Sequence, residues 1–296
     1  MPGACQTGEV TTTMRVETAA FQGERGAFSE EAARTLLGRR VNVLPCQRFE
    51  ELFRNLTEKK VQAAVVPIEN TLAGSVHENY DHLLHHDLPI VAETSVRIVH
   101  NLIAPPGVPF RNIRRVFSHP VALNQCLNFF SNHPRIERIS FYDTAGSVKM
   151  IMEEGLRDAA GIASALAAVN YGAAILKRSI EDDRQNFTRF FLLRRPEFAR
   201  KFPVRTNSRT KWKTSLVFTT RNIPGALFRS LSAFALRDLN LAKIESRPLR
   251  GKPWEYLFYL DFFGHVDDPV SQKALGRLQE LADFLRVLGC YPQGDI

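Results

Sequence analysis

The sequence has 296 residues, of which 44% are hydrophobic and 24% are charged, a composition typical of a soluble globular protein with about two domains. It excludes a disordered or fibrous chain, and no apolar run approaches the ~20 residues that a membrane-spanning helix needs, so we expect no membrane partner. Most of the net charge of +8 falls in residues 194–212, which hold seven basic residues and one acidic residue.

The first residues of the chain carry no recognisable targeting signal. Met1 to Thr18 lacks both the apolar stretch of a secretory signal and the Arg-rich amphipathic pattern of an organelle transit peptide. We therefore interpret residues 1–16 as a loose N-terminal arm and expect a cytoplasmic protein. The four cysteines share no C-x-x-C pair and no zinc-site spacing: Cys5, Cys46, Cys126 and Cys290. In that compartment we expect four reduced thiols.

Between residues 17 and 193, apolar strands alternate with helical patterns. Strands are expected at Glu17–Gln22, Val41–Leu44, Ala63–Pro67, Arg114–Phe117, Ile139–Tyr142 and Ala159–Ala163. Helices are expected at Phe28–Leu37, Arg48–Thr57, Val121–Ser131, Thr144–Glu154 and Leu166–Gly172. This alternation indicates an α/β fold in which parallel strands are joined by crossover helices.

Several strands end in a short polar turn that opens a helix. These turns are Gln22–Ser29, Pro67–Ser75, Ser118–Pro120, Asp143–Ser147 and Ala163–Ala165. Because helix N-termini present unpaired N–H groups and the positive end of the helix dipole, several of them together favour a carboxylate or phosphate ligand. For Ser118 and Thr144 the alternative is a helix cap, and for Glu69 and Asn70 it is a surface loop. The G-x-G-x-x-G and P-loop fingerprints do not occur, so we expect no nucleotide cofactor.

Three histidines lie at helical spacing, at His82, His85 and His86. This spacing can bind a metal ion, but no carboxylate arrangement completes the ligand set. We interpret them as a solvated helix face and expect neither a metal site nor any other cofactor.

The segment from Glu181 to Leu193 contains an acidic trio followed by a strand that is otherwise apolar. Thr188 and Arg189 interrupt this strand, and because strand side chains alternate, they point to opposite faces. We expect Thr188 to face a ligand, while Arg189 either belongs to the ligand site or forms a structural ion pair with neighbouring carboxylates.

We interpret residues 194–212 as a basic linker, because they lack apolar periodicity and include Pro196 and Pro203. No aromatic residues are interleaved with the basic ones to form a binding face, and no nucleic-acid-binding motif is present. We therefore expect a solvated connector and no nucleic-acid partner.

After the linker, residues 213–296 show a different order of elements. We expect a strand at Thr214–Thr220, a helix at Gly225–Arg237, strands at Leu241–Pro248 and Trp254–Phe263, a helix at Pro269–Phe284 and a strand at Leu285–Tyr291. This order is typical of the split βαβ, ferredoxin-like α+β fold. The chain therefore has two domains of different architecture.

The polar motifs of the chain resemble those of the prephenate dehydratase family, including its arogenate-using members, from about Ala19 to Pro292. The matching motifs in the α/β region are Gly23-x-x-Gly26-Ala27-Phe28-Ser29, Pro67-Ile68-Glu69-Asn70-Thr71, Ser118-His119-Pro120 with Gln125, Asp143-Thr144-Ala145 and Asn186-x-Thr188-Arg189-Phe190. In the second domain, the motifs similar to the two signatures of the family's regulatory ACT domain are Pro224-Gly225-Ala226-Leu227 and Glu245-Ser246-Arg247-Pro248.

This resemblance implies a catalytic domain at residues 17–193, built of two α/β lobes similar to a type II periplasmic binding protein. One lobe would comprise residues 17–98 and 180–193, and the other residues 99–179. The active site would lie in the cleft between the lobes. The C-terminal domain, residues 213–296, would be the ACT regulatory domain.

The resemblance also implies a reaction. The family removes the ring carboxylate of prephenate as carbon dioxide and its 4-hydroxyl as water, which gives phenylpyruvate, or phenylalanine when the substrate is arogenate. Thr188 would donate a hydrogen bond or proton to the leaving hydroxyl, and Glu69 would act as an acid if the cleft raises its pKa. Asn70 and Gln125 would orient the substrate. The implied substrate-binding residues are Ser29, Ser118, Thr144, Ala145, Ser164, Arg189 and Phe190.

For the C-terminal domain, the resemblance implies that L-phenylalanine binds as a feedback effector at an interface between subunits of a homodimer or homotetramer. The implied effector-binding residues are Asn222, Gly225, Ala226, Leu227, Glu245, Ser246 and Arg247. The alternative is that Gly225 only makes a turn and that the domain only dimerises.

Two alternatives stay open at this level. Prephenate and arogenate differ by a keto group or an amine on the side chain, and no carboxylate can be assigned to the amine, so an arogenate dehydratase is the first. A non-catalytic, amino-acid-sensing binding protein is the second, because two-lobed architectures also serve simple solute binders. The residues around Thr188 favour an enzyme, since a binder has no need of that set.

Overall fold

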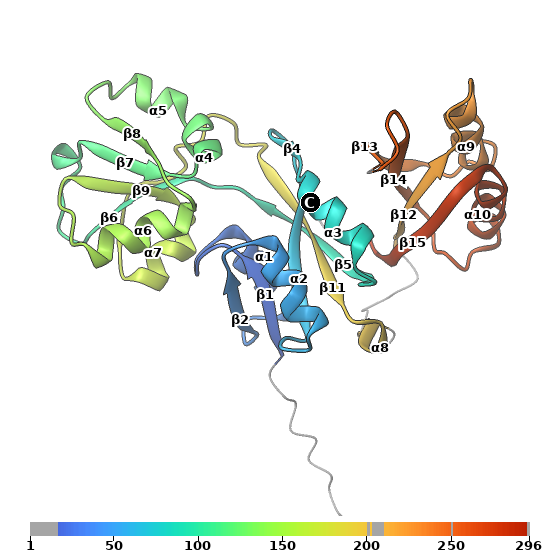
Figure 1. Ribbon diagram of the computed structural model, residues 1–296. Helices are drawn as coiled ribbons and strands as arrows, with labels where there is room; N and C mark the ends of the chain where they lie inside the picture. Colours follow the sequence, from blue (N-terminus) through green and yellow to red (C-terminus); the bar gives the residue numbers. More distant parts are fainter. Residues whose placement is uncertain (1–16, 200–201, 203–209, 250, 295–296) are drawn as a thin grey trace, which may run out of the picture.

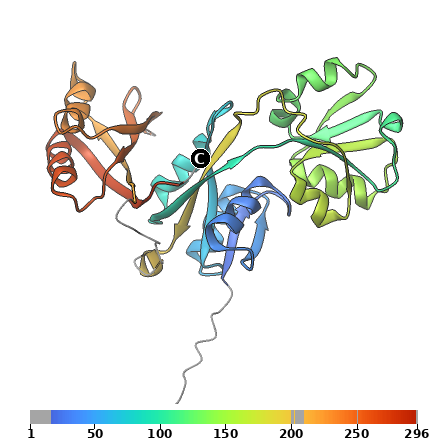
Figure 2. The same cartoon turned by 180° about the vertical axis from the view of Figure 1, so that it is seen from behind.

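The computed structural model describes residues 17–199, 202, 210–249 and 251–294. Three units lie in a row: a first α/β lobe in the middle, a second α/β lobe on one side of it and a C-terminal domain on the other (Figure 1, and from behind in Figure 2). The predicted N-terminal arm lies outside the described residues. Within the described part of the chain, no helix is both long and apolar enough to cross a membrane.

The first lobe is a mixed sheet covered by α1 on one face and by α2 and α3 on the other. Its elements are β1 (Thr18–Gln22), α1 (Phe28–Leu37), β2 (Asn42–Cys46), α2 (Phe49–Thr57), β3 (Ala63–Asn70), β4 (Gly74–Ser75), α3 (His77–His85), β5 (Ile90–Arg97) and β11 (Phe187–Arg194). The first lobe contributes the order β5-β11-β3-β1-β2, with β4 beside β3, to a larger sheet that continues beyond β5 into the C-terminal domain through the pairing of Gly289 with Ile90. β1 is parallel to β2 and β3, as predicted, but β11 is antiparallel to both of its neighbours. No direction was predicted for β11, which returns from the second lobe and enters the sheet from the opposite end.

The second lobe has its own sheet, in the order β10-β6-β9-β7-β8. Its elements are β6 (Asn101–Ala104), η1 (Phe110–Asn112), β7 (Arg115–Ser118), α4 (Pro120–Asn124), α5 (Leu127–Ser131), β8 (Glu137–Ser140), α6 (Thr144–Glu153), β9 (Ala159–Ala163), α7 (Ala165–Tyr171) and β10 (Ala174–Lys177). The single helix expected at Val121–Ser131 is wrong: it breaks at Gln125 and Cys126 into α4 and α5. This break places Gln125 between two short helices rather than on a helix face.

Two segments cross between the lobes side by side. The N–H of Ile98 donates to the carbonyl of Asn186 at 2.8 Å, and the N–H of Ile180 donates to the carbonyl of His100 at 2.9 Å. One crossing leads from β5 to β6, and the other leads from β10 back to β11 (Figure 1). The lobes are therefore joined by a two-stranded connection.

The C-terminal domain has four antiparallel strands and two helices in the order expected from the sequence. They are β12 (Trp212–Thr220), α9 (Ala226–Ala235), β13 (Leu241–Pro248), β14 (Tyr256–Phe263), α10 (Pro269–Leu281) and β15 (Ala282–Pro292). The sheet order β13-β14-β12-β15 is that of a ferredoxin-like fold. Both helices lie on the side away from the first lobe, so the open face of the sheet is directed toward that lobe (Figure 1).

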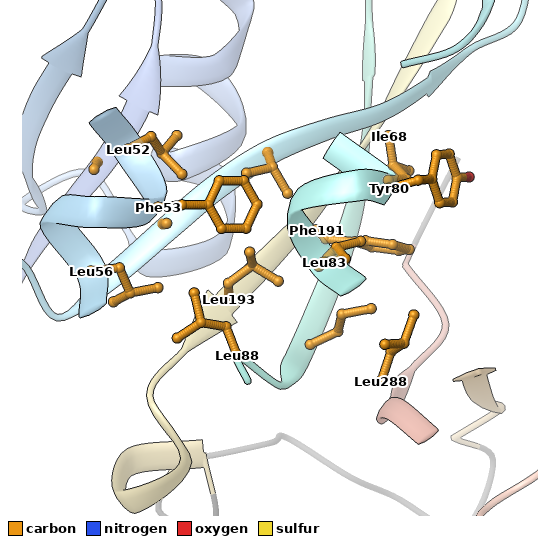
Figure 3. Close-up of a cluster of buried hydrophobic side chains, with 14 of the residues drawn as sticks. Leu52, Phe53, Leu56, Ile68, Tyr80, Leu83, Leu88, Phe191, Leu193 and Leu288 are labelled. Carbon is orange, nitrogen blue, oxygen red and sulfur yellow. The ribbon is translucent and has the colours of Figure 1, made fainter. Parts of the chain in front are cut away.

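The first lobe and the C-terminal domain share one hydrophobic core. Figure 3 shows Leu52, Phe53 and Leu56 of α2 and Leu83 of α3 together with side chains of β3 and β11. Leu288 of β15 lies in the same cluster, which also includes Val217, Leu257, Tyr259 and Tyr291 of the C-terminal domain. Each fully buried large apolar side chain contributes about 1.5–3 kcal/mol. The second lobe has a separate cluster, centred on Leu102, Val116 and Ile162.

The structure changes the interpretation of the predicted linker. β11 continues to Arg194, and the four-residue helix α8 (Pro196–Ala199) follows it. Arg194 and Arg195 are buried, and Nη1 of Arg195 donates to the carbonyls of Leu56 and Val61 at 3.1 and 2.7 Å. The prediction of a solvated connector is therefore wrong for its first two residues, while most of residues 200–209 lies outside the described part.

The histidines at the C-terminal end of α3 also differ from expectation. His82 and His86 stack on Phe53, with 4.7 and 5.2 Å between ring centroids, so only His85 is exposed as predicted. The described residues contain no group of three or more side chains placed to hold a metal ion.

Candidate active site

Asn70 and Thr188 meet where the neighbouring strands β3 and β11 reach the junction of the lobes. The two residues are paired in the register of the strands, and Nδ2 of Asn70 donates to Oγ1 of Thr188 at 3.0 Å. The side-chain oxygen of Asn70, Oδ1, accepts from the backbone N–H groups of Leu72 and Ala73 at 3.0 and 2.8 Å, and these two bonds fix the orientation of the side-chain amide. The Thr188 hydroxyl is therefore an acceptor toward Asn70, and its own proton remains available for another acceptor.

A chain of hydrogen bonds continues from Asn70 into the second lobe. Nδ2 of Asn70 also donates to Oδ1 of the fully buried Asn186 at 2.7 Å, and Nδ2 of Asn186 donates to Oε1 of Gln125 at 2.9 Å. Nε2 of His100 lies 2.9 Å from the same Gln125 oxygen. Because this oxygen receives two donors, the Gln125 amide NH₂ is left to donate elsewhere.

His100 acts in this chain as a neutral donor. It is 2% exposed, and burial lowers its pKa, although the hydrogen bond to Gln125 and the charge of Glu181 oppose that effect. A neutral imidazole has one N–H, and the carbonyl of Gln125 requires it at Nε2. Nδ1 is therefore a buried acceptor, and it has no partner in the structure.

A cavity of 370 Å³ lies beside Gln125, between the two lobes. It is lined by Leu72 and Ala73 of the first lobe, Val121, Asn124 and Gln125 of the second, and Asp182 and Asp183 of the returning segment. Asp182 accepts from the N–H groups of Leu127 and Asn128 and so caps α5. The cavity and the Asn70–Gln125 chain together define the candidate active site.

On the other side of the junction, the turn after β1 packs against α7. Oγ of Ser164 donates to the carbonyl of Gly26 at 2.6 Å and accepts from the N–H of Ala167 at 3.1 Å, so it caps α7 and joins the lobes. Gly26 has φ +90°, and a Cβ there would lie 2.5 Å from the Cα of Ala167. A residue without a side chain is therefore required for the lobes to approach this closely.

The structure brings together three of the four predicted catalytic residues, Asn70, Gln125 and Thr188, through recorded hydrogen bonds. The predicted substrate-binding residues are more scattered. Ser118 is fully buried and donates to the carbonyl of Ile162 at 2.7 Å, and Ala145 is fully buried as well. Ser29 is buried in α1, and Thr144 is the first residue of α6. The side-chain caps of α4 and α6 are His119 and Asp143, so the alternative of Ser118 and Thr144 as caps is also wrong.

The structure corrects the assignment of Glu69, Arg189 and Phe190 to the ligand site. Glu69 and Arg189 pair with each other directly next to the Asn70–Thr188 pair. Because side chains alternate along a strand, Glu69 and Arg189 point to the opposite face of the sheet. Glu69 accepts from Nζ of Lys243 at 2.8 Å, on the C-terminal domain. Phe190 is 2% exposed and lies in the hydrophobic cluster under α1.

Arg189 forms the structural ion pairs that were its alternative. It donates to Glu93 and Asp261, both at 2.6 Å, and to the hydroxyl of Tyr291 at 3.1 Å. Burial disfavours the charged guanidinium, but the two carboxylates outweigh it and raise the pKa of Arg189.

Two members of the hydrogen-bond chain were missed from the sequence. Asn186 lies two positions before Thr188 in the same motif, and this spacing was the signal that could have identified it. His100 is a single histidine near the crossing between the lobes, and nothing in its sequence neighbourhood indicates its contact with Gln125.

In the described part of the chain, the predicted effector residues fall into two groups that are joined by no hydrogen bond or ion pair. Gly225 has φ +75° and precedes α9; beside it lies a cavity of 260 Å³ lined by Thr220, Arg221, Ile223, Ala226, Arg229, Glu280, Leu281, Ala282 and Asp283. Glu245 instead accepts from Ser75 at 2.6 Å and contacts His77 at 3.2 Å, both on the first lobe. Burial opposes ionisation of Glu245, yet these bonds and the charge of Lys243 lower its pKa.

The chain matches the family model of prephenate dehydratase over residues 19–198. It is 44% identical to arogenate dehydratase/prephenate dehydratase 2, chloroplastic, of Arabidopsis thaliana, over 97% of this chain and 75% of that relative. A solved prephenate dehydratase from Arthrobacter aurescens, in complex with L-Phe, is 31% identical with a TM-score of 0.84, over 93% of this chain and 90% of that one. A structure described as GqqA, a novel type of quorum quenching acylase, is 33% identical with a TM-score of 0.84, over 93% and 97%.

Proposed function

The chain belongs to the prephenate dehydratase family, whose members include arogenate dehydratases, and we propose that its substrate is prephenate and its product phenylpyruvate. The enzyme is thus a hydro-lyase of phenylalanine biosynthesis. The observation that carries the proposed site is the Thr188 hydroxyl, which accepts from the Asn70 amide and keeps its own proton available. That amide is fixed by the N–H groups of Leu72 and Ala73, and these two residues line the interlobe cavity. We propose that the lobes enclose the ligand as those of type II periplasmic binding proteins do.

The reaction needs a donor for the leaving hydroxyl. As the ring carboxylate leaves as carbon dioxide, its bonding electrons enter the ring, and the 4-hydroxyl departs from the opposite carbon with a proton as water. We propose that Thr188 donates the hydrogen bond to that hydroxyl. A threonine hydroxyl is a weak acid, so the Asn70 N–H bond assists by stabilising charge that develops on the threonine oxygen. Formation of the aromatic ring supplies the driving force.

The remaining roles concern the grip on the substrate. The Gln125 amide NH₂ is directed away from His100 and Asn186 and would donate to a substrate oxygen. We propose that Ser29, Thr144 and Ala145 contribute to binding the carboxylates, with backbone N–H groups of the first turn of α6 as donors. Ser118 and Ser164 would take part through their backbone, since their hydroxyls already donate to carbonyl oxygens.

Incubation of the purified chain with prephenate and with arogenate, separately, tests the substrate. Phenylpyruvate formed from prephenate with the higher kcat/KM supports the proposal. Phenylalanine formed mainly from arogenate would make the chain an arogenate dehydratase, the function named first for its plant relative. Tight binding of either compound without any product would favour a non-catalytic binding protein.

The likeness to a quorum quenching acylase raises amide hydrolysis as a further activity. A threonine nucleophile would need a general base within hydrogen-bond distance. Among the described residues, the Thr188 hydroxyl forms a hydrogen bond with Asn70 and with no histidine or carboxylate. This geometry favours the dehydratase, and release of a free acid from an acyl amide by the purified chain would contradict that preference.

We also propose that the C-terminal domain is an ACT domain that binds L-phenylalanine in a homodimer or homotetramer. The ferredoxin-like order, the turn at Gly225 and the L-Phe complex of the Arthrobacter relative support this role. Calorimetric titration of phenylalanine into the wild type and into Gly225→Val tests it, because equal binding by both proteins, or none by the wild type, defeats the proposal. We propose a cytoplasmic location, which fractionation of cells would test.

A further inference from the structure

The C-terminal domain contacts the two strands that carry Asn70 and Thr188 on the face opposite to these two side chains. Asn70 and Thr188 face the junction of the lobes, while their next neighbours, Glu69 and Arg189, face the opposite way. Both of these neighbours bond to side chains of the C-terminal domain. Each active-site side chain is therefore one residue away from an anchor on another domain.

Arg189 belongs to a buried network of two cations and two carboxylates, which we call the joint network. Arg189 bonds to Glu93 of β5 and to Asp261 of β14, and Lys213 of β12 bonds to the second oxygen of Glu93 at 2.6 Å. The hydroxyl of Ser215 lies 2.5 Å from both Asp261 and Tyr291. The side chains of the two cations and two carboxylates are between 3% and 14% exposed. Each of the four buried charges of the network thus has a partner of opposite charge, and the network joins the first lobe to three strands of the C-terminal domain.

The second anchor acts on β3. Nζ of Lys243 donates to Glu69 at 2.8 Å and to the hydroxyl of Ser75 at 3.0 Å. Lys243 lies on β13, two positions before Glu245, which itself accepts from Ser75. The strand that carries one half of the proposed effector site therefore contacts the strand that carries Asn70.

The backbone of β11 is paired differently on its two sides at this position. Its register with β5 is regular from Phe187 to Leu192, but its register with β3 shifts between Arg189 and Phe190, where Ile68 of β3 has no partner on β11. The planar guanidinium of Arg189 binds two carboxylates and a phenol in fixed directions. Its contacts restrict the residue that follows Thr188 directly.

We propose that Arg189 is a positioning residue for Thr188, and that the joint network is the route by which the C-terminal domain controls the hydroxyl of Thr188. The inference rests on the proposed dehydratase function for its kinetic readout. A displacement of the C-terminal domain would move Asp261 and Tyr291, and through Arg189 it would displace Thr188 from Asn70. Loss of kcat with little change in KM is the expected signature, because the groups that grip the substrate stay in place.

The test uses the full chain and three near-isosteric changes. Asp261→Asn removes a negative charge that pairs with Arg189 but keeps an acceptor oxygen, and Tyr291→Phe removes the phenol oxygen that accepts from Arg189. Arg189→Lys keeps the charge but loses the planar fork. Arg115→Gln is the control, because it breaks an ion pair with Asp158 in the second lobe whose side chains are 36% and 48% exposed. The readouts are kcat, KM and amide hydrogen exchange at β11.

We expect kcat to fall about 10- to 100-fold in Asp261→Asn, because a small misplacement of a reacting group lowers the rate by that order. The fall should be smaller in Tyr291→Phe, and Arg115→Gln should behave like the wild type. Exchange at residues 186–190 should rise in the same order. A folded Asp261→Asn protein with wild-type kcat and wild-type exchange at β11 overturns the inference. If the wild type turns over neither substrate, the proposed function fails, and the exchange data alone then decide whether the joint network holds β11.

Discussion

The first lobe meets its two neighbours in different ways. Against the C-terminal domain it shares an apolar core with Leu288 and Tyr291 and a buried ionic network. Against the second lobe it shares a smaller buried apolar cluster, in which Phe21 and Ala27 meet Ile103, Val148 and Ala167, and it makes hydrogen bonds through Ser164 and Asn186. The first lobe and the C-terminal domain therefore form one packed body, whereas the boundary between the two lobes also contains an open cavity beside Gln125 and a chain of amide hydrogen bonds.

The largest expected effect comes from removing the proposed hydrogen-bond donor, the hydroxyl of Thr188, which lies on the first lobe. Thr188→Ala should lower kcat by about 10²- to 10⁴-fold, the range typical of a lost proton or hydrogen-bond donor to a leaving group. Steady-state turnover measures it, with circular dichroism to check the fold. Thr188→Ser keeps the hydroxyl and is the matched control, so equal activity of the alanine and serine variants would remove Thr188 from the reaction.

The shared core is tested by Leu288→Ala. This side chain is 7% exposed within the cluster of Figure 3, and its truncation should cost about 2–5 kcal/mol of unfolding free energy. Hydrogen exchange should show that β11 and β15 lose protection together. Leu102→Ala, in the separate core of the second lobe, should leave both strands protected. Loss of protection in β15 alone would contradict a common body.

The contact between the lobes is tested by Gly26→Ala. An added Cβ would collide with the backbone of Ala167 and would also sit at positive φ, so we expect a loss of about 1–3 kcal/mol together with a higher KM. Gly38→Ala is the control, because Gly38 has φ +89° but nothing within 4 Å of the new Cβ. If both variants keep the KM of the wild type, the close approach at Gly26 has no role in the cleft.

The smallest effect concerns pH at the cleft. Burial lowers the pKa of His100, so the unfolded chain binds a proton more readily than the folded one. Its contribution to stability is complete above the unfolded pKa of about 6.5 and is lost as the pH falls through that value toward the lower folded pKa. Urea unfolding between about pH 7.5 and pH 5 should show a flatter stability curve for His100→Asn than for the wild type. The exposed His85→Asn is the control, and a wild-type slope in His100→Asn would contradict a neutral, buried imidazole.

Much of the fold could be predicted from the sequence, because strong periodicity marks helices such as α1 and α6 and the order of elements in the C-terminal domain. Four strands were missed for physical reasons. β4 has only two residues, and β6 and β10 have four each and show no alternation that separates them from loops. β5 holds polar residues, among them Glu93 of the joint network.

The positions of site residues could be predicted where local strand geometry determines them, and could not where the tertiary fold determines them. The alternation of strand side chains correctly separated Thr188 from Arg189, and the same rule, applied to Glu69 and Asn70, would have excluded Glu69 from the ligand face. The meeting of Asn186, Gln125 and His100 depends on two crossings between lobes and on the break between α4 and α5. No local pattern encodes these features.

The most direct test of the account is a crystal structure of the chain with a non-reactive cyclohexadiene dicarboxylate that retains the 4-hydroxyl. We predict that this ligand lies between the lobes with its 4-hydroxyl oxygen about 2.7 Å from Oγ1 of Thr188, a normal O–H···O distance, while Asn70 still donates to Thr188. A ligand bound elsewhere, or one whose hydroxyl has no contact with Thr188, would contradict the central claim.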